Sequence, residues 1–73
     1  MKIYAIEDIG QIIRSRRIEL GLKQSQLADL SGSGIRFISE LENGKPTMQV
    51  GKVLDTMLVL GLDMSVSIRG SKL

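Results

Sequence analysis

The side chains that most often perform acid–base, nucleophilic and metal chemistry are missing from this chain of 73 residues, which has no histidine and no cysteine. Without these residues there are no disulfides, no thiolates and none of the usual zinc ligands. Histidine is also the commonest general base. A catalytic site would have to use Ser, Asp, Glu and Lys alone. We therefore expect no enzymatic activity, no metal and no cofactor.

One glycine-rich stretch, Gly32–Gly34, has the spacing that opens a dinucleotide-binding loop. Such a loop needs a third glycine three residues later and a strand before it. Phe37 occupies the third position, and the residues before Gly32 have helical rather than strand periodicity. A nucleotide site is therefore excluded.

With catalytic and nucleotide sites set aside, the chain's basic side chains are the groups left that could bind a partner. The formal net charge is +2, from 10 basic and 8 acidic residues, which by itself is only a weak indication of nucleic-acid binding. Their placement is more informative, because most of them flank or lie within one short segment, residues 24–43. The basic residues concerned are Arg14, Arg16, Arg17, Lys23, Arg36, Lys45 and Lys52.

The composition is that of a folded protein, with 42% hydrophobic and 25% charged residues. At this length residues 1–73 form one domain at most, and its small core should be supported by a partner or a second copy. No apolar run approaches the length of a membrane span. The start, Met1–Asp8, lacks the features of a signal peptide, so we expect a cytoplasmic protein.

Four glycines, each placed after a run of helical periodicity, predict where helices end. The predicted helices cover about residues 7–20, 24–31, 35–43 and 48–60, with Thr47 as the N-cap of the last. In the first helix Arg17 falls on the apolar stripe with Ile13, so it needs an acidic partner.

The second and third helices are too short to be stable alone, and only three residues separate them. This arrangement describes a helix-turn-helix. Ala28 is small where the helices approach, and Gly32 should take a positive φ at the turn. The residues expected to face inward are Leu27, Ala28, Leu30, Ile38 and Leu41. The opposite face of the third helix carries Arg36, Ser39, Glu40 and Asn43.

The fourth helix is apolar on more than one face, which favours a dimer contact. Residues 63–68 then alternate apolar and polar, the spacing of a strand. A lone strand is unstable, so it must pair with Lys2–Ile6, with its counterpart in another copy or with a different protein. The residues predicted at the dimer interface are Met57, Leu58, Met64, Val66 and Ile68.

Residues 24–43, QSQLADLSGSGIRFISELEN, followed by Gly44 and Lys45, resemble the phage-repressor-type (XRE) helix-turn-helix family. The resemblance covers about residues 8–60. It implies an all-α, lambda-repressor-like domain of four helices plus a short C-terminal β-strand. Such a protein would bind double-stranded DNA at a palindromic operator as a homodimer. Arg17 and Glu42 match the internal ion pair of that family.

A narrower resemblance, to the HipB-type antitoxins, rests on residues 36–47, the helix that follows, and residues 60–66. In those proteins a C-terminal strand replaces the fifth helix of phage repressors and forms the dimer contact. They bind their own promoter and hold a HipA-type kinase toxin. The resemblance thus implies an autoregulating repressor and antitoxin.

Arg36 is the first candidate for base recognition, because it lies in the first turn of the third helix and arginine can bridge O6 and N7 of guanine. The other residues predicted to face the bases are Ile35, Phe37, Ser39 and Glu40. For Glu40, contact with cytosine N4 and pairing with Arg36 remain equal alternatives. A phenylalanine such as Phe37 more often fills the core or a dimer contact than touches a base. The predicted phosphate contacts are Lys23, Gln24, Asn43 and Lys45.

Two other functions remain open. The chain could be a stand-alone small repressor or controller protein, or a protein-interaction module that has lost DNA binding and only blocks a partner. A neighbouring reading frame with kinase motifs would favour the antitoxin. Loss of salt-dependent DNA affinity would favour the interaction module.

Overall fold

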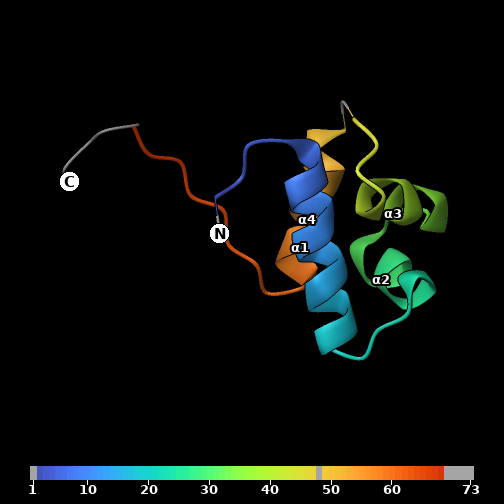
Figure 1. Cartoon of the computed structure of the whole chain (residues 1–73). Helices are drawn as coiled ribbons and strands as arrows, with labels where there is room; N and C mark the ends of the chain where they lie inside the picture. The colour runs from blue at the N-terminus through green and yellow to red at the C-terminus, as the bar shows by residue number, and fades with distance from the viewer. Residues whose placement is uncertain (1, 48, 69–73) are drawn as a thin grey trace.

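Four α-helices follow one another in the computed structural model, which describes residues 2–47 and 49–68. They are α1 (Ile6–Glu19), α2 (Gln24–Ser31), α3 (Ile35–Glu42) and α4 (Val50–Val59) (Figure 1). The all-α class and the four helices are as predicted. Both ends of α1 and the end of α3 are shifted by one residue, while α4 begins two residues later and ends one residue earlier than predicted. Within the described residues, no helix has the length and apolar character needed to cross a membrane.

Each helix ends with the same pair of backbone hydrogen bonds, in which a glycine and the residue after it donate to carbonyl groups of the last turn. After α3, for example, Gly44 N donates to Leu41 O at 3.1 Å and Lys45 N to Glu40 O at 3.0 Å. The motif requires a left-handed backbone at its glycine, and Gly44 has a φ of 80°. The glycines with positive φ are Gly21, Gly32, Gly44 and Gly61. The glycine pattern therefore predicted all four helix ends correctly.

Side chains bond to the backbone just before α1 and α4. The carboxylate of Asp8 accepts hydrogen bonds from Tyr4 N at 2.8 Å and Ala5 N at 3.1 Å, and so ties the chain to the first turn of α1. The prediction of Thr47 as the N-cap of α4 is wrong, because α4 begins at Val50 with Gln49 as its N-cap. Thr47 Oγ1 instead accepts from Gln49 N at 3.0 Å, a local turn that precedes the helix. The predicted first residue, Met48, lies outside the described residues.

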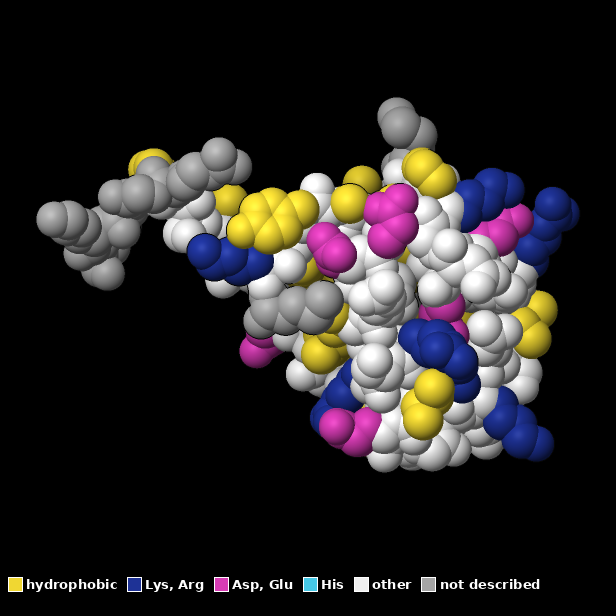
Figure 2. Space-filling view, in the orientation of Figure 1, with side chains coloured by type: hydrophobic (Ala, Val, Ile, Leu, Met, Phe, Trp, Pro, Cys, Tyr) yellow, Lys and Arg dark blue, Asp and Glu magenta, His cyan; other side chains and the backbone are white. Residues whose placement is uncertain are grey.

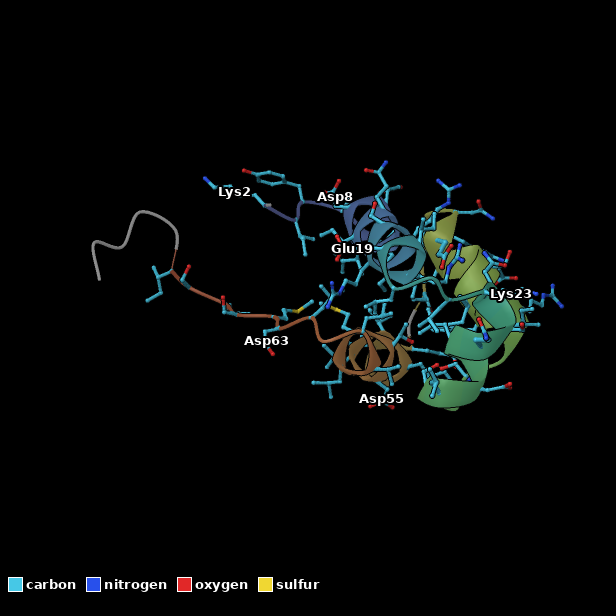
Figure 3. All side chains as sticks on the ribbon, turned by 90° about the horizontal axis from the view of Figure 1, so that it is seen from below. Lys2, Asp8, Glu19, Lys23, Asp55 and Asp63 are labelled. Carbon is cyan, nitrogen blue, oxygen red and sulfur yellow. The ribbon has the colours of Figure 1, made fainter. Side chains whose placement is uncertain are left out.

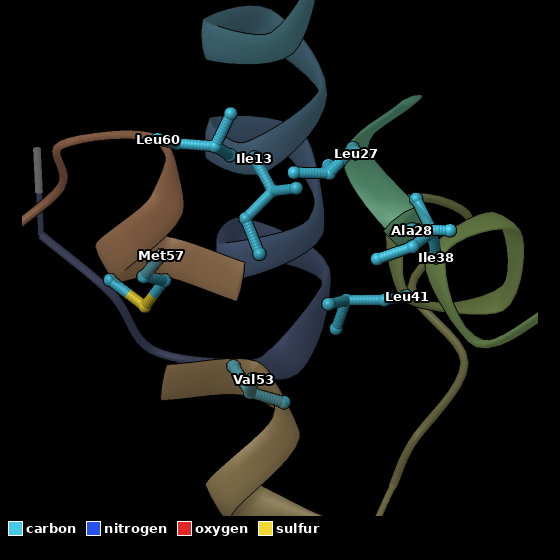
Figure 4. Packing of buried hydrophobic residues seen from close by; sticks show 8 residues of the cluster. All are labelled: Ile13, Leu27, Ala28, Ile38, Leu41, Val53, Met57 and Leu60. Atoms are coloured by element: carbon cyan, nitrogen blue, oxygen red, sulfur yellow. The ribbon is translucent and has the colours of Figure 1, made fainter. Parts of the chain in front are cut away.

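All four helices contribute to one hydrophobic core, in which Ile13 of α1 points between Leu27 of α2 and Leu60 of α4 (Figure 4). The core residues are Ile13, Leu27, Ala28, Ile38, Leu41, Val53, Met57 and Leu60. Leu30 was expected in the core but is 61% exposed, because Leu27 and Ala28 already occupy the inward face of the short helix α2. Met57 is only 4% exposed, so its predicted place at a dimer interface is wrong: it fills the core of its own chain.

Gly10 marks the closest approach of α1 to α3. A Cβ atom at this position would lie 2.1 Å from the carbonyl oxygen of Leu41, a backbone atom that cannot rotate away. Gly10 is buried, and it allows α1 to pack directly against the last turn of α3. Nothing in the sequence marks this close contact, because a glycine inside a helical pattern has no periodic signature.

The strand predicted over residues 63–68 is not formed in this single chain. Beyond Leu62 the described residues run extended and away from the helices, as the orange segment in Figure 1 shows. A strand requires a hydrogen-bonded partner, and within residues 2–47 and 49–68 the chain forms none for this segment. Of the three pairings left open, the one with Lys2–Ile6 of the same chain is therefore not formed in this structure.

Gly10→Ala should destabilise the fold, because the added methyl group would collide with the backbone of α3. We expect a loss of about 1–3 kcal/mol in the free energy of unfolding, measured by urea denaturation. Gly51→Ala is the matched control, since Gly51 is an exposed residue of α4 with open space around it. It should raise stability by about 0.5–1 kcal/mol through helix propensity alone. Equal effects of the two substitutions would contradict a close contact at Gly10.

Candidate nucleic-acid interface

The segment Gly32–Gly34 joins α2 and α3 through a tight turn. Gly32 has a φ of 71°, and Ser33 N donates to Ala28 O at 3.1 Å. Ala28 is buried beside the turn, so the two helices pack closely there. Their arrangement, with α3 across the end of α2 in Figure 1, is a helix-turn-helix.

The two faces of α3 have opposite characters. Ile38 and Leu41 are fully buried and fix the helix to the core. On the other side, Ile35 is exposed and the Arg36 side chain is 89% exposed, while Ser39 and Glu40 are half-buried. Four of the five residues predicted to face the bases therefore lie on one accessible surface.

Phe37, the fifth of these residues, is half-buried and packs against the hydrophobic core. The Nζ atom of Lys52, on α4, lies 5.6 Å from the centre of its ring, within the range of a cation–π interaction. Lys52 thus brings a positive charge from α4 to the flank of α3. The sequence analysis counted Lys52 among the flanking basic residues but did not assign it a site, because this contact depends on the packing of α4 beside α3.

The last turn of α3 is held by an ion pair with α1. Arg17 Nε donates to Glu42 Oε2 at 2.7 Å and Arg17 Nη2 to Glu42 Oε1 at 3.0 Å, a bidentate geometry. Arg17 Nη1 also donates to the carbonyl of Leu22 at 2.8 Å. The Glu42 side chain is 2% exposed, and its hydrogen bonds raise the pKa of Arg17 above the ordinary value. We refer to Arg17 and Glu42 as the clamp.

Gln24, the first residue of α2, joins the clamp. Its Nε2 donates to Glu42 Oε1 at 3.2 Å, so the start of α2 lies beside the end of α3. A side-chain amide has two N–H groups, so this hydrogen bond uses only one of them. This contact also places Lys23, just before α2, on the same side of the molecule as Asn43, just after α3. All three residues, with Lys45, were predicted to contact phosphates.

Basic side chains gather on this side of the molecule, over α2 and α3, in Figure 2. Lys23 is labelled there in Figure 3, on the opposite side from Lys2. Lys23, Asn43 and Lys45 are exposed. The predicted base-facing residues other than Phe37 therefore share one surface with the predicted phosphate-facing residues. This α3 surface consists of Ile35, Arg36, Ser39, Glu40, Lys23, Gln24, Asn43 and Lys45.

One acidic residue lies within the α3 surface. Glu40 Oε1 accepts from Arg36 Nε at 3.0 Å and lies 3.3 Å from Lys45 Nζ. The hydrogen bond from Arg36, and to a smaller extent that from Lys45, holds the pKa of the Glu40 carboxyl below its ordinary value of 4.5. The carboxyl is therefore ionised at neutral pH. Of the two alternatives for Glu40, pairing with Arg36 is the one present in the free chain.

The residues predicted at a dimer interface divide into two groups. Met57 is buried, as described above, whereas Leu58 on α4 is exposed. Met64, Val66 and Ile68 are exposed on the extended segment after α4, and Val66 is 94% exposed. At the base of this segment, Arg16 Nε donates to the carbonyl of Leu60 at 2.9 Å and so ties the end of α4 to α1.

The sequence profile of the helix-turn-helix family matches residues 13–55, from the middle of α1 to the middle of α4. The chain belongs to this family, in its XRE-type branch. It is 45% identical over 65 residues to an uncharacterized HTH-type transcriptional regulator, y4mF, of Sinorhizobium fredii, covering 89% of this chain and 86% of that protein. The XRE-type assignment made from residues 24–45 is thus confirmed, and the chain is a helix-turn-helix transcriptional regulator.

Solved structures with the same fold include two kinds of regulator. The structure of a HipA–HipB–O2–O3 complex contains a similar chain, with a TM-score of 0.83 and 25% identity over 94% of this chain and 97% of that one. The restriction-modification controller protein C.AhdI from Aeromonas hydrophila has a TM-score of 0.71 and 28% identity, over 80% of this chain and 88% of that one.

Removing one partner of the clamp should leave a buried, unpaired charge. Glu42→Ala is expected to cost about 3–5 kcal/mol in the free energy of unfolding, enough to unfold most of so small a protein. Circular dichroism with urea denaturation measures this loss. Glu19→Ala, which removes an exposed carboxylate paired with Arg16, should cost well under about 1 kcal/mol.

The double substitution Arg17→Met with Glu42→Leu separates charge from packing. If the cost of Glu42→Ala comes from the unpaired Arg17 cation, the double variant should be markedly more stable than the single one. A double variant as unstable as Glu42→Ala would contradict this explanation.

Proposed function

We propose that this protein is a sequence-specific repressor that inserts α3 into the major groove of double-stranded DNA. The observation that carries the proposal is the exposed Arg36 on the first turn of a helix whose other face is anchored by Ile38 and Leu41. A rigidly mounted, exposed arginine at this position is what bidentate recognition of guanine requires. A role on DNA also agrees with the expected cytoplasmic location.

The other residues of the α3 surface divide by chemistry. Ile35 is suited to the methyl group of thymine and Ser39 to either a donor or an acceptor, while Glu40 can accept from cytosine N4. Phe37 is the least suited of the predicted set, because the core already contacts its ring. Phosphate contacts fall to Lys23, Gln24, Asn43 and Lys45, together with the free N–H groups at the start of α2.

We propose that two copies bind a palindromic operator. The support is the apolar surface that one chain leaves exposed: Leu58 on α4, and Met64, Val66 and Ile68 on the following segment. Two copies that pair these segments would cover this surface and supply the hydrogen-bond partner that residues 63–68 lack in the single chain. The two α3 helices would then enter successive major grooves, roughly 34–36 Å apart.

The partner we propose is a HipA-type kinase toxin, which makes this protein the autoregulating antitoxin of that pair. The support is the similarity to a chain of the HipA–HipB–O2–O3 complex along almost the full length of both chains. The similarity to C.AhdI, with a slightly higher identity over less of the chain, supports a second candidate, a stand-alone controller protein. Co-purification with the product of a neighbouring kinase-like gene would favour the antitoxin.

Arg36→Ala should sharply reduce the preference for the protein's own upstream DNA over a scrambled duplex. Losing one bidentate base contact costs about 1–3 kcal/mol of discrimination, about five- to 150-fold in affinity. Fluorescence anisotropy at two salt concentrations measures both duplexes. Lys2→Ala is the matched control, because it removes one positive charge on the side of the molecule opposite Lys23. Retained discrimination by Arg36→Ala would contradict its role, and a wild-type chain without any preference would contradict the proposed function.

Val66→Asp should convert a dimer into a folded monomer. Because Val66 is 94% exposed in the single chain, an aspartate there leaves the helical core intact and introduces charge only where a second copy would pack. Sedimentation equilibrium gives the mass, and circular dichroism checks the fold. Ser65→Asp, on the alternate face of the same segment, is the control and should leave more of the dimer. A dimer unaffected by Val66→Asp would exclude this segment from the interface.

A further inference from the structure

Among residues 2–47 and 49–68, Glu40 is the acidic residue that pairs with both Arg36 and Lys45, two cations of the α3 surface. A single oxygen, Oε1, accepts the hydrogen bond of Arg36 at 3.0 Å and lies 3.3 Å from the ammonium of Lys45. The side chains of Arg36 and Lys45 are 89% and 60% exposed, whereas that of Glu40 is 36% exposed. The carboxylate is thus the least exposed of the three side chains, and it pairs with both cations.

The backbone holds this arrangement in place. Arg36 and Glu40 are one turn apart on α3, where side chains are neighbours. Lys45 is brought back over the same turn by the left-handed Gly44, and Lys45 N donates to the carbonyl of Glu40 at 3.0 Å. The same residues that end α3 thus fix Lys45 beside Glu40.

The electrostatic consequence depends on the proposed function, because it concerns the approach of DNA. Arg36 and Lys45 offer two positive charges to the duplex, and Glu40 reduces their sum to one. Every phosphate that approaches is attracted less, and it must also compete with the carboxylate for the same donors. This opposition acts on any DNA sequence. At an operator, Arg36 gains hydrogen bonds to a guanine and Glu40 can accept from a cytosine, and these contacts replace the ones that are lost.

We propose that Glu40 is a specificity-determining residue, whose carboxylate restrains Arg36 and Lys45 and thereby suppresses binding to DNA of arbitrary sequence. Its contribution is negative: it weakens every complex, and weakens the operator complex least. Glu40 differs in this from the clamp residue Glu42, which is buried and joins helices.

The test compares Glu40→Gln with the wild-type chain on upstream and scrambled duplexes. Glutamine keeps the length of the side chain and removes its charge. We expect affinity for the scrambled duplex to rise about tenfold, with a smaller rise for the upstream duplex. The slope of log affinity against log salt should become steeper by about one, as Lys45 becomes free to contact a further phosphate. The preference for upstream DNA should fall accordingly.

Glu19→Gln is the matched control, because Glu19 is likewise an exposed helical carboxylate paired with an arginine. It lies on α1, and its partner Arg16 donates to Leu60 O at the end of α4. The substitution gives the same change in net charge and should alter affinity for both duplexes by less than about twofold. In an Arg36→Ala background, Glu40→Gln should produce a smaller rise than in the wild type, because one of the two restrained cations is gone.

The outcomes separate the two proposals. If the wild-type chain prefers its upstream DNA while Glu40→Gln leaves scrambled-duplex affinity and salt slope unchanged, the role of Glu40 is overturned and the proposed function stands. The same holds if Glu19→Gln has as large an effect as Glu40→Gln, since net charge would then explain it. A wild-type chain with no preference overturns the proposed function and this inference with it.

Discussion

The ion pair between Arg17 and Glu42 constrains the rest of the molecule, because it is the most directional contact between α1 and α3. Hydrophobic burial stabilises the helices together but acts without regard to direction. A bidentate pair, by contrast, has one geometry and loses its hydrogen bonds when either helix rotates. Helices as short as α2 and α3 depend on such contacts, since neither would be stable in isolation. Gln24 extends the constraint to α2, so that one carboxylate orients the whole helix-turn-helix.

The position of the clamp leaves the rest of α3 free for recognition. The buried residues Ile38 and Leu41 hold one face, Glu42 holds the last turn, and Gly10 lets α1 come close enough for all three to be reached. The opposite face of α3 is therefore not needed to hold the helix in place. So small a protein can carry a polar, exposed face on α3 because the buried face of the same helix stabilises the fold.

The end of α3 combines structure and electrostatics in three residues, Glu40, Gly44 and Lys45. Gly44 ends the helix and reverses the chain, and the same reversal puts Lys45 over Glu40. At the far end of the molecule the corresponding motif after α4 releases the chain instead, and an apolar segment is left exposed. In the proposed complex the first end would face DNA, and the exposed segment at the second end would pack against another copy of the chain.

The sequence by itself determined what depends on local chemistry. Helix periodicity and the four glycines located the helices and their ends, because a left-handed residue after the last turn is a local requirement. The need of Arg17 for an acidic partner also followed from its place on an apolar stripe.

Tertiary packing decided the rest. Leu30 was expected in the core and Met57 at an interface, but in the folded chain Leu30 is exposed and Met57 is buried. Periodicity shows which residues share a helix face, but it does not show what packs against that face. The close approach at Gly10, the Lys52–Phe37 contact and the convergence of Arg36 and Lys45 on Glu40 join residues whose distances only the folded chain sets. The strand predicted over residues 63–68 is a further example. Its alternation of apolar and polar residues is visible in the sequence, but whether it has a hydrogen-bond partner depends on the folded structure.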